Sequence, residues 1–153
     1  MDNQPPKKTK LKRWLIILSL VLVGLPWGVG TYIDWKPRFG PSELGNVRND
    51  TVRVSIIRLI ASPENYEGKC VQVTGFLRIE FEGNALYLAE TDYRHRIGKN
   101  GLWVDASDER LRELSNFSGH YVLIEGVFEP DDTGHMGAFS GAIRDVNRCR
   151  LVW

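Results

Sequence analysis

Hydrophobic positions divide the chain into one uninterrupted apolar run and a later region in which apolar and polar residues alternate. Residues 14–33 read WLIILSLVLVGLPWGVGTYI, twenty positions without a charged side chain. A helix of this length spans about 30 Å, which is the thickness of the hydrocarbon layer of a bilayer. The run therefore predicts one transmembrane helix. A cleaved secretion signal shares the pattern of a basic start and an apolar run, and it remains an alternative.

Charge is distributed unevenly around this run. Residues 1–13 hold five basic side chains and one acid, whereas residues 34–153 hold 15 basic and 18 acidic ones. Because basic segments beside a span tend to stay in the cytoplasm, we expect a cytoplasmic tail at 1–13. The body would then lie on the periplasmic side of a bacterial inner membrane. Its acidic balance argues against a nucleic-acid partner, which requires clustered Lys and Arg.

The segment 34–50 contains Pro, Gly and polar residues without an apolar period and is predicted to be a linker. A domain is expected at 51–153. Its clearest alternation, CVQVTGFLRIEFE, runs from 70 to 82, and Phe81 is expected to be the last inward residue of this long strand. Gly75 on the same inward face predicts a bend.

Four more strands are predicted at 85–90, 102–105, 120–129 and 138–152, with a break in the last near Asp145. Short helices are expected after Ser55, at Pro63 and after Ser107, because Ser caps helices and Pro favours their first position. Five strands with a helix between the third and fourth predict a mainly β protein, an OB-fold-like five-stranded β-barrel with short helices.

Four segments carry a family resemblance: SPENYEGKCVQVTGFL, FEGNALYL, KNGLWVD and GHMGAFSGAI. They resemble small uncharacterised bacterial proteins that have an N-terminal membrane or export segment. The resemblance covers roughly residues 52–146. It implies an exported or membrane-anchored OB-fold-like domain and brings no known activity.

Ligands of OB-folds lie across the second and third strands and the loops beside them. A basic loop at 92–100 and an acidic loop at 129–137 are expected to flank this face as a positive and a negative wall. Met136 is expected to tuck under the barrel mouth. The candidate ligand-binding residues are Glu82, Asn84, Tyr87, Tyr93, Arg94, Arg96, Lys99, Trp103 and His135.

Other chemistry has weaker support in the sequence. The three histidines lack the spacing of metal ligands, so neither a metal centre nor a cofactor is predicted. Cys70 and Cys149 form a disulfide in one interpretation, since cysteines of exported domains often pair. In the usual OB strand order, however, their strands are not neighbours, and both alternatives stay open.

The preferred function is a membrane-tethered, extracytoplasmic binding module for a protein or cell-envelope ligand, with the bilayer as the partner of residues 14–33. An alternative is an accessory subunit that assembles through the anchor helix, where Gly24 and Gly28 have the spacing of a helix-contact motif. A third hypothesis, an enzyme using Glu80, Glu82 and His135, is disfavoured because no nucleophile motif accompanies them.

Overall fold

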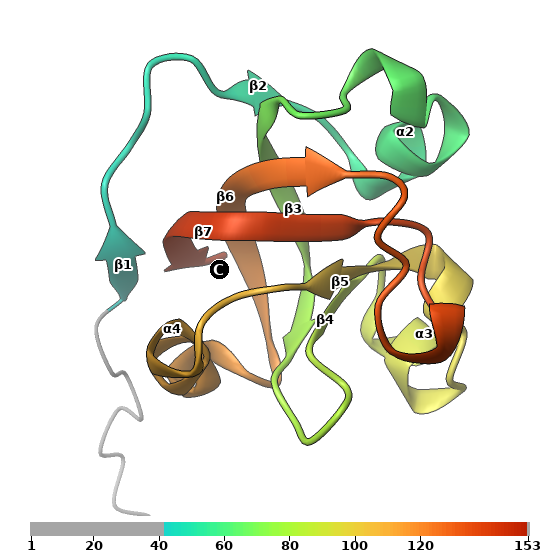
Figure 1. Ribbon diagram of the computed structural model, residues 1–153. Coiled ribbons are helices and arrows are strands. Elements are labelled where there is room, and N and C mark those ends of the chain that lie inside the picture. Colours follow the sequence, from blue (N-terminus) through green and yellow to red (C-terminus); the bar gives the residue numbers. More distant parts are fainter. Residues whose placement is uncertain (1–41, 153) are drawn as a thin grey trace, which may run out of the picture. The chain divides into compact units, whose positions relative to one another are not determined.

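A computed structural model describes residues 42–152 (Figure 1). The expected tail at 1–13, the expected span at 14–33 and most of the expected linker lie outside these residues. Between residues 42 and 152, no helix has the length and apolar character that a membrane crossing requires.

Five strands close into a barrel: β3 (Cys70–Arg78), β4 (Ala85–Tyr87), β5 (Gly101–Val104), β6 (His120–Glu129) and β7 (Ala142–Leu151). Around the barrel β3 pairs with β4, β4 with β5, β5 with β7, β7 with β6, and β6 returns to β3. Only the β5–β7 contact of this ring is parallel. The sequence prediction of a mainly β, five-stranded barrel with short helices is confirmed.

Period-two alternation in β3 places apolar side chains inside this barrel. Val71, Val73 and Leu77 are fully buried. Gly75 lies on the same face, where a Cβ atom would come within 2.6 Å of the Tyr87 carbonyl oxygen. A side chain at this position would therefore push β3 away from β4, so Gly75 allows the two strands to approach closely.

The end of the first predicted strand was wrong. β3 ends at Arg78 rather than at residue 82, and a turn follows in which Phe81 is 92% exposed. Alternation alone could not show this, because the pattern continues past the point where pairing with β4 stops.

A second, outer apolar cluster also forms beside the barrel: Phe76, Ala85, Tyr87 and Phe139, with Tyr93 and Trp103 packed against it.

The predicted helices form where the capping residues stand. α2 (Ile56–Ala61) begins after Ser55, whose hydroxyl accepts a hydrogen bond from the Arg58 backbone N–H. Pro63 opens the 3₁₀ turn η1 (Pro63–Asn65). Such capping satisfies backbone donors that have no partner within the helix.

α4 (Asp108–Leu114) likewise begins after Ser107 and continues into η3 (Ser115–Phe117). It lies between β5 and β6 in the chain, as predicted. Leu114 and Phe117 join the barrel core.

One connection contains more structure than predicted. Instead of a strand to residue 90 and a loop at 92–100, β4 stops at Tyr87, and α3 (Glu90–Arg94) and η2 (Gly98–Asn100) follow. Asp92 explains the helix start, because its carboxylate accepts hydrogen bonds from the Ala89 N–H at 3.0 Å and from the Asn100 side chain at 3.0 Å.

Two short strands extend the sheet beyond the barrel. β1 (Glu43–Gly45) pairs antiparallel with β7, and β2 (Val52–Arg53) pairs parallel with β3. β1 belongs to the segment expected to be a linker, so the described part of that segment packs on the barrel. Figure 1 shows this strand beside the C-terminal end of β7.

The last strand, β7, begins at Ala142 rather than at residue 138. Its predicted break near Asp145 is confirmed: this residue has a φ of 47°, and the β6–β7 register shifts between Glu125 and Val127. A bulge of this kind bends a strand and increases its twist, which helps the barrel to close.

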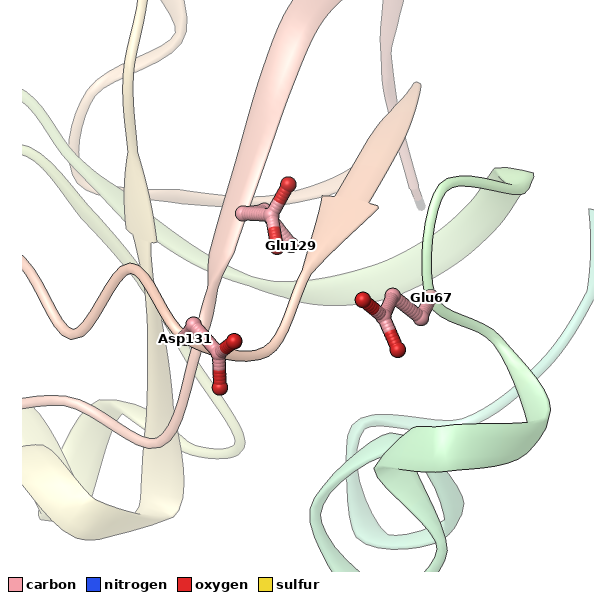
Figure 2. A group of neighbouring side chains, drawn as sticks. All are labelled: Glu67, Glu129 and Asp131. Atoms are coloured by element: carbon pink, nitrogen blue, oxygen red, sulfur yellow. The ribbon is translucent and has the colours of Figure 1, made fainter.

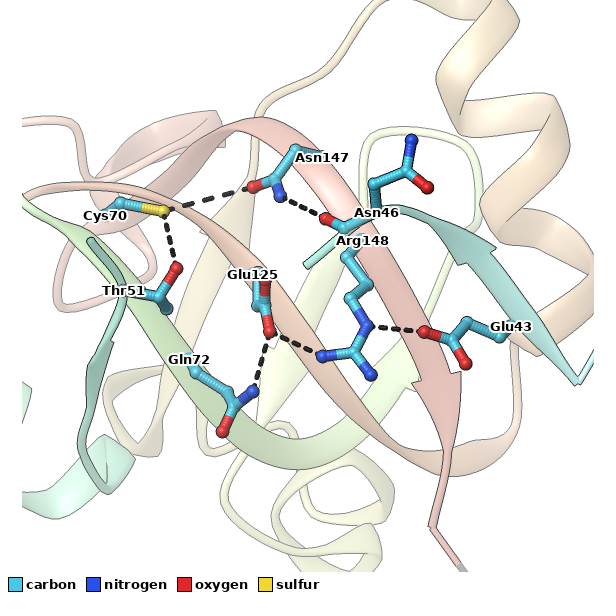
Figure 3. A network of polar contacts seen from close by, with 8 residues as sticks. All are labelled: Glu43, Asn46, Thr51, Cys70, Gln72, Glu125, Asn147 and Arg148. Carbon is cyan, nitrogen blue, oxygen red and sulfur yellow. Dashed lines mark hydrogen bonds and ion pairs between the residues drawn. The ribbon is translucent and has the colours of Figure 1, made fainter. Parts of the chain in front are cut away.

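A buried polar network links β1, β3, β6 and β7 (Figure 3). Glu125 is 0% exposed, and its Oε1 accepts hydrogen bonds from Gln72 at 2.6 Å and from Arg148 at 2.7 Å. Arg148 also donates to Glu43 at 2.6 Å. Burial raises the pKa of the Glu125 carboxyl, but the hydrogen bonds from Arg148 and Gln72 outweigh burial and leave this pKa below its ordinary value.

Cys70 and Cys149 are both buried and free in the structure. Cys70 is on β3 and Cys149 is on β7. Strand β6 lies between these two strands and pairs with each of them. The Cys70 sulfur lies 3.5 Å from the Thr51 hydroxyl. Burial raises the pKa of the Cys149 thiol to about 12.

Candidate functional site

A pocket of about 670 Å³ opens beside the outer apolar cluster, a size usual for small-ligand sites. Three segments form its walls. They are the β3–β4 turn at 80–83, the end of α3 with Arg96 two positions after it, and the β6–β7 loop at 135–139, which includes η4 (His135–Gly137). Each wall is therefore a connection between barrel strands.

Six of the nine predicted ligand-binding residues line this pocket. They come from separate parts of the sequence and meet because the barrel brings its connecting loops together. The six are Glu82, Tyr87, Tyr93, Arg94, Arg96 and His135.

The other three predicted residues hold the walls in place. The Asn84 side-chain oxygen accepts a hydrogen bond from the Glu80 N–H at 3.2 Å. The Lys99 ammonium group donates to the carbonyls of Gly137 at 2.9 Å and Phe139 at 2.8 Å. The Trp103 ring packs on the Phe139 ring, with their centroids 5.6 Å apart. None of the three lines the pocket itself.

Aromatic rings form the apolar part of the lining. Tyr87 meets Tyr93 edge-on at 5.6 Å and Phe139 edge-on at 6.0 Å between centroids. Edge-to-face contacts at these distances are favourable and fix ring orientation. Burial raises the pKa of the Tyr87 hydroxyl, and the nearby Glu80 carboxylate acts in the same direction.

Two charged side chains of the pocket have partners on the protein. Glu80 accepts a hydrogen bond from Arg78 at 3.2 Å and one from the Tyr93 hydroxyl at 3.3 Å. The guanidinium of Arg78 also lies 4.5 Å above the Tyr93 ring, a cation–π distance. Arg94 pairs with Glu90 of the same helix at 2.6 Å.

Two others are free of strong contacts. Glu82 lies 3.7 Å from the His135 ring nitrogen, which is longer than a hydrogen bond but within ion-pair distance when the imidazole is protonated. The Arg96 backbone N–H donates to the Tyr93 carbonyl at 3.0 Å, but no hydrogen bond or ion pair joins its guanidinium to another residue within 42–152. Both backbones have positive φ, 54° for Glu82 and 57° for Arg96, which is uncommon for residues other than Gly.

Met136 does not plug the barrel as expected. It is 90% exposed, has a φ of 54° and lies at the pocket rim. Phe139 is the residue that turns inward from this loop and is almost fully buried. It packs into the outer apolar cluster beside the barrel.

The predicted negative wall was also misplaced, because none of the acids at 129–132 lines the pocket. Glu129 and Asp131 instead gather with Glu67, all with carboxylate oxygens within 4.8 Å of one another (Figure 2). Asp132 pairs with Arg144 at 3.0 Å. The carboxylates of the pocket come from the β3–β4 turn.

The group of Glu67, Glu129 and Asp131 is the one set of side chains within residues 42–152 that is close enough to hold a metal ion. Ca²⁺ usually takes six to eight oxygen ligands, more than three side chains readily supply. Two of the three residues are exposed, and exposed acids also cluster without an ion. The geometry therefore assigns no metal to this group.

Six lining residues were not among the predicted ligand contacts: Glu80, Phe81, Gly83, Met136, Ala138 and Phe139. Phe81 had been placed inside the barrel, and the loop residues carried no motif. The described lining offers acid and base groups in Glu82 and His135 beside aromatic and apolar side chains, and it contains no Ser, Thr or Cys.

Comparisons with protein-family models, with curated proteins and with solved structures find no match for this chain.

Proposed function

We propose that residues 51–153 form an OB-fold-like binding module whose ligand site is the pocket between the β3–β4 turn, α3 and the β6–β7 loop. The strand order and the position of α4 between the third and fourth barrel strands support this proposal. OB-folds bind ligands on the second and third strands and on the loops after the first and fourth. The observation that carries the proposal is that the pocket is lined by residues from these same two loops.

The module acts, in this proposal, at the periplasmic face of a bacterial inner membrane, to which residues 14–33 tether it. Support comes from the uncharged run, the basic residues before it and the resemblance to small anchored or exported bacterial proteins. The ligand is a protein or a component of the cell envelope. Net acidic charge in the body disfavours nucleic acid.

Crosslinking of the full-length protein in intact cells, followed by purification, tests the binding site. Arg96→Glu should remove the captured partner, because it inverts the charge of the lining guanidinium that has no side-chain partner among residues 42–152. Arg58→Glu is the matched control on exposed α2, outside the pocket, and should retain capture. Equal capture by both variants would contradict the proposal. Lys99 is unsuitable for charge reversal because its ammonium group holds the loop.

The second candidate is an accessory subunit of a membrane complex. Gly24 and Gly28, separated by three residues within the apolar run, favour it, since small residues at this spacing let membrane helices pack closely. Replacing both residues with Leu separates the two functions. Loss of capture in this double variant, with capture retained in Arg96→Glu, would favour assembly through the helix.

A further inference from the structure

The charged side chains around the pocket differ in whether other residues of the protein form hydrogen bonds with them. Glu80 and Arg94 have partners at hydrogen-bond distance, as described above. Glu82 and Arg96 do not, within residues 42–152. One anion and one cation, on different walls of the same pocket, are thus left to interact with a ligand.

Apolar surface lies in the same pocket. Phe81 and Met136, from the β3–β4 turn and the β6–β7 loop, are among the most exposed large apolar side chains of residues 42–152. Tyr87, Tyr93 and Phe139 add rings to the lining. A bound apolar group would remove this surface from water, which is favourable in proportion to the area buried.

The mixed charge selects among ligands of different charge. A polyanion would pair with Arg96 but would meet the carboxylates of Glu80 and Glu82, and a polycation would meet the guanidinium groups. A neutral ligand would bury charged groups without giving them partners, which costs free energy. A ligand with one group of each sign gives a hydrogen-bond partner to both Glu82 and Arg96, whose charged groups form no hydrogen bond within residues 42–152.

We propose that the pocket binds a zwitterionic ligand with an apolar body, of the class of short peptides with free termini. The carboxylate pairs with Arg96 and the ammonium group with Glu82, while the apolar side chain lies against the pocket rings. This inference rests on the proposed function of the pocket as a ligand site.

Calorimetric titration of the full-length protein in lipid nanodiscs tests the charge requirement. The probe is the tripeptide Ala-Phe-Ala in four forms: free, N-acetylated, C-amidated and blocked at both ends. Hydrogen bonds to charged groups contribute at least about 1.5 kcal/mol, so blocking either end should weaken binding about tenfold. The doubly blocked form should bind most weakly.

Two variants assign each end of the peptide to its side chain. With Arg96→Gln, the free and C-amidated forms should bind equally, because the carboxylate no longer has its partner. With Glu82→Gln, the free and N-acetylated forms should bind equally. Matched controls on exposed helix positions outside the pocket, Arg58→Gln and Glu109→Gln, should keep the preference for the free peptide.

Three results would overturn the inference. One is equal binding of all four peptide forms, with an affinity that Phe81→Ala reduces; the pocket would then be a ligand site that recognises only the apolar group. Tighter binding of the N-acetylated peptide, or of oligothymidylate, would indicate an anionic ligand instead. Absence of binding by every peptide form at millimolar concentration would exclude this ligand class. The crosslinking experiment in cells would still test separately whether the pocket is a binding site.

Discussion

Replacing Arg148 with Met tests the buried network most severely. The change removes the guanidinium from Glu125 and leaves a solvent-inaccessible carboxylate with Gln72 as its remaining side-chain donor. Removing one partner of a buried ion pair costs about 3–5 kcal/mol of the free energy of unfolding. Because the Arg148 side chain is 12% exposed and the pair is therefore not fully buried, we expect the lower end, about 3 kcal/mol.

The pH dependence of this loss has a defined sign. In the wild type the pKa of Glu125 is below its ordinary value of 4.5, so the ionised carboxylate stabilises the fold above that pH. This stability is lost as the pH falls through the lowered pKa. Without Arg148, burial dominates and favours the protonated acid. The difference in stability between wild type and variant should therefore begin to shrink above pH 4.5, as the pH falls through the raised pKa of the variant. It should shrink further as the pH falls through the lowered pKa of the wild type.

Urea denaturation of the full-length protein in mild detergent, followed by circular dichroism, measures the effect. Glu43→Gln is a control for the outer half of the network: Glu43 is 40% exposed, so its loss should cost no more than about 1 kcal/mol. Adding Glu125→Gln to Arg148→Met removes the buried charge and should recover at least half of the loss. A double variant as unstable as Arg148→Met alone would refute the reasoning.

Three further predictions concern the cysteines and the pocket walls. Mass spectrometry after alkylation in denaturant without reductant should find two free thiols, and Cys149 should resist alkylation at pH 8 in the native state because burial raises its pKa to about 12. Gly134→Ala should cost about 1–3 kcal/mol in urea denaturation, since its φ is 64° and a Cβ would lie 2.6 Å from the Trp103 ring; Gly68→Ala, at a φ of 67° with open space, should cost less. Lys99→Met should cost about 1 kcal/mol and speed hydrogen exchange at 135–139, because two hydrogen bonds to that loop are lost; unchanged exchange there would contradict the role assigned to the ammonium group.

The sequence predicted those elements whose residues act locally. Ser55 and Ser107 cap helices through their own side chains, and β6 has the predicted bounds because its alternation and its pairing end together. The break at Asp145 was visible as a change of phase in the apolar pattern. In each of these cases, neighbouring residues contain the physical cause.

Features that depend on distant partners could not be predicted in the same way. α3 forms in a polar stretch because Asn100 and the Ala89 N–H both bond to Asp92. Phe81 was misplaced because the end of β3 is set by its pairing with β4, which alternation does not record. β1 depends on an edge of β7 about a hundred positions away.

The candidate site was predicted in part for the same reason. Polar and aromatic loop residues were recognisable from their types, and general knowledge of the barrel placed three connections together. The sequence did not indicate which of these side chains form hydrogen bonds with other parts of the protein. Lys99 and Asn84 were therefore predicted to contact the ligand, whereas in the structure their side chains form hydrogen bonds that hold the loops.

A photoreactive amino acid in place of Phe81, activated in intact cells, tests the central claim that the pocket between the β3–β4 turn, α3 and the β6–β7 loop binds the ligand. Phe81 is exposed at the pocket rim, so the substitution should leave the barrel intact. The matched control is the same substitution at Ile57, which is 60% exposed on α2 and outside the pocket. The account predicts an adduct at position 81 that Arg96→Gln or Glu82→Gln abolishes, and none at 57. An adduct at 57 with none at 81 would contradict it.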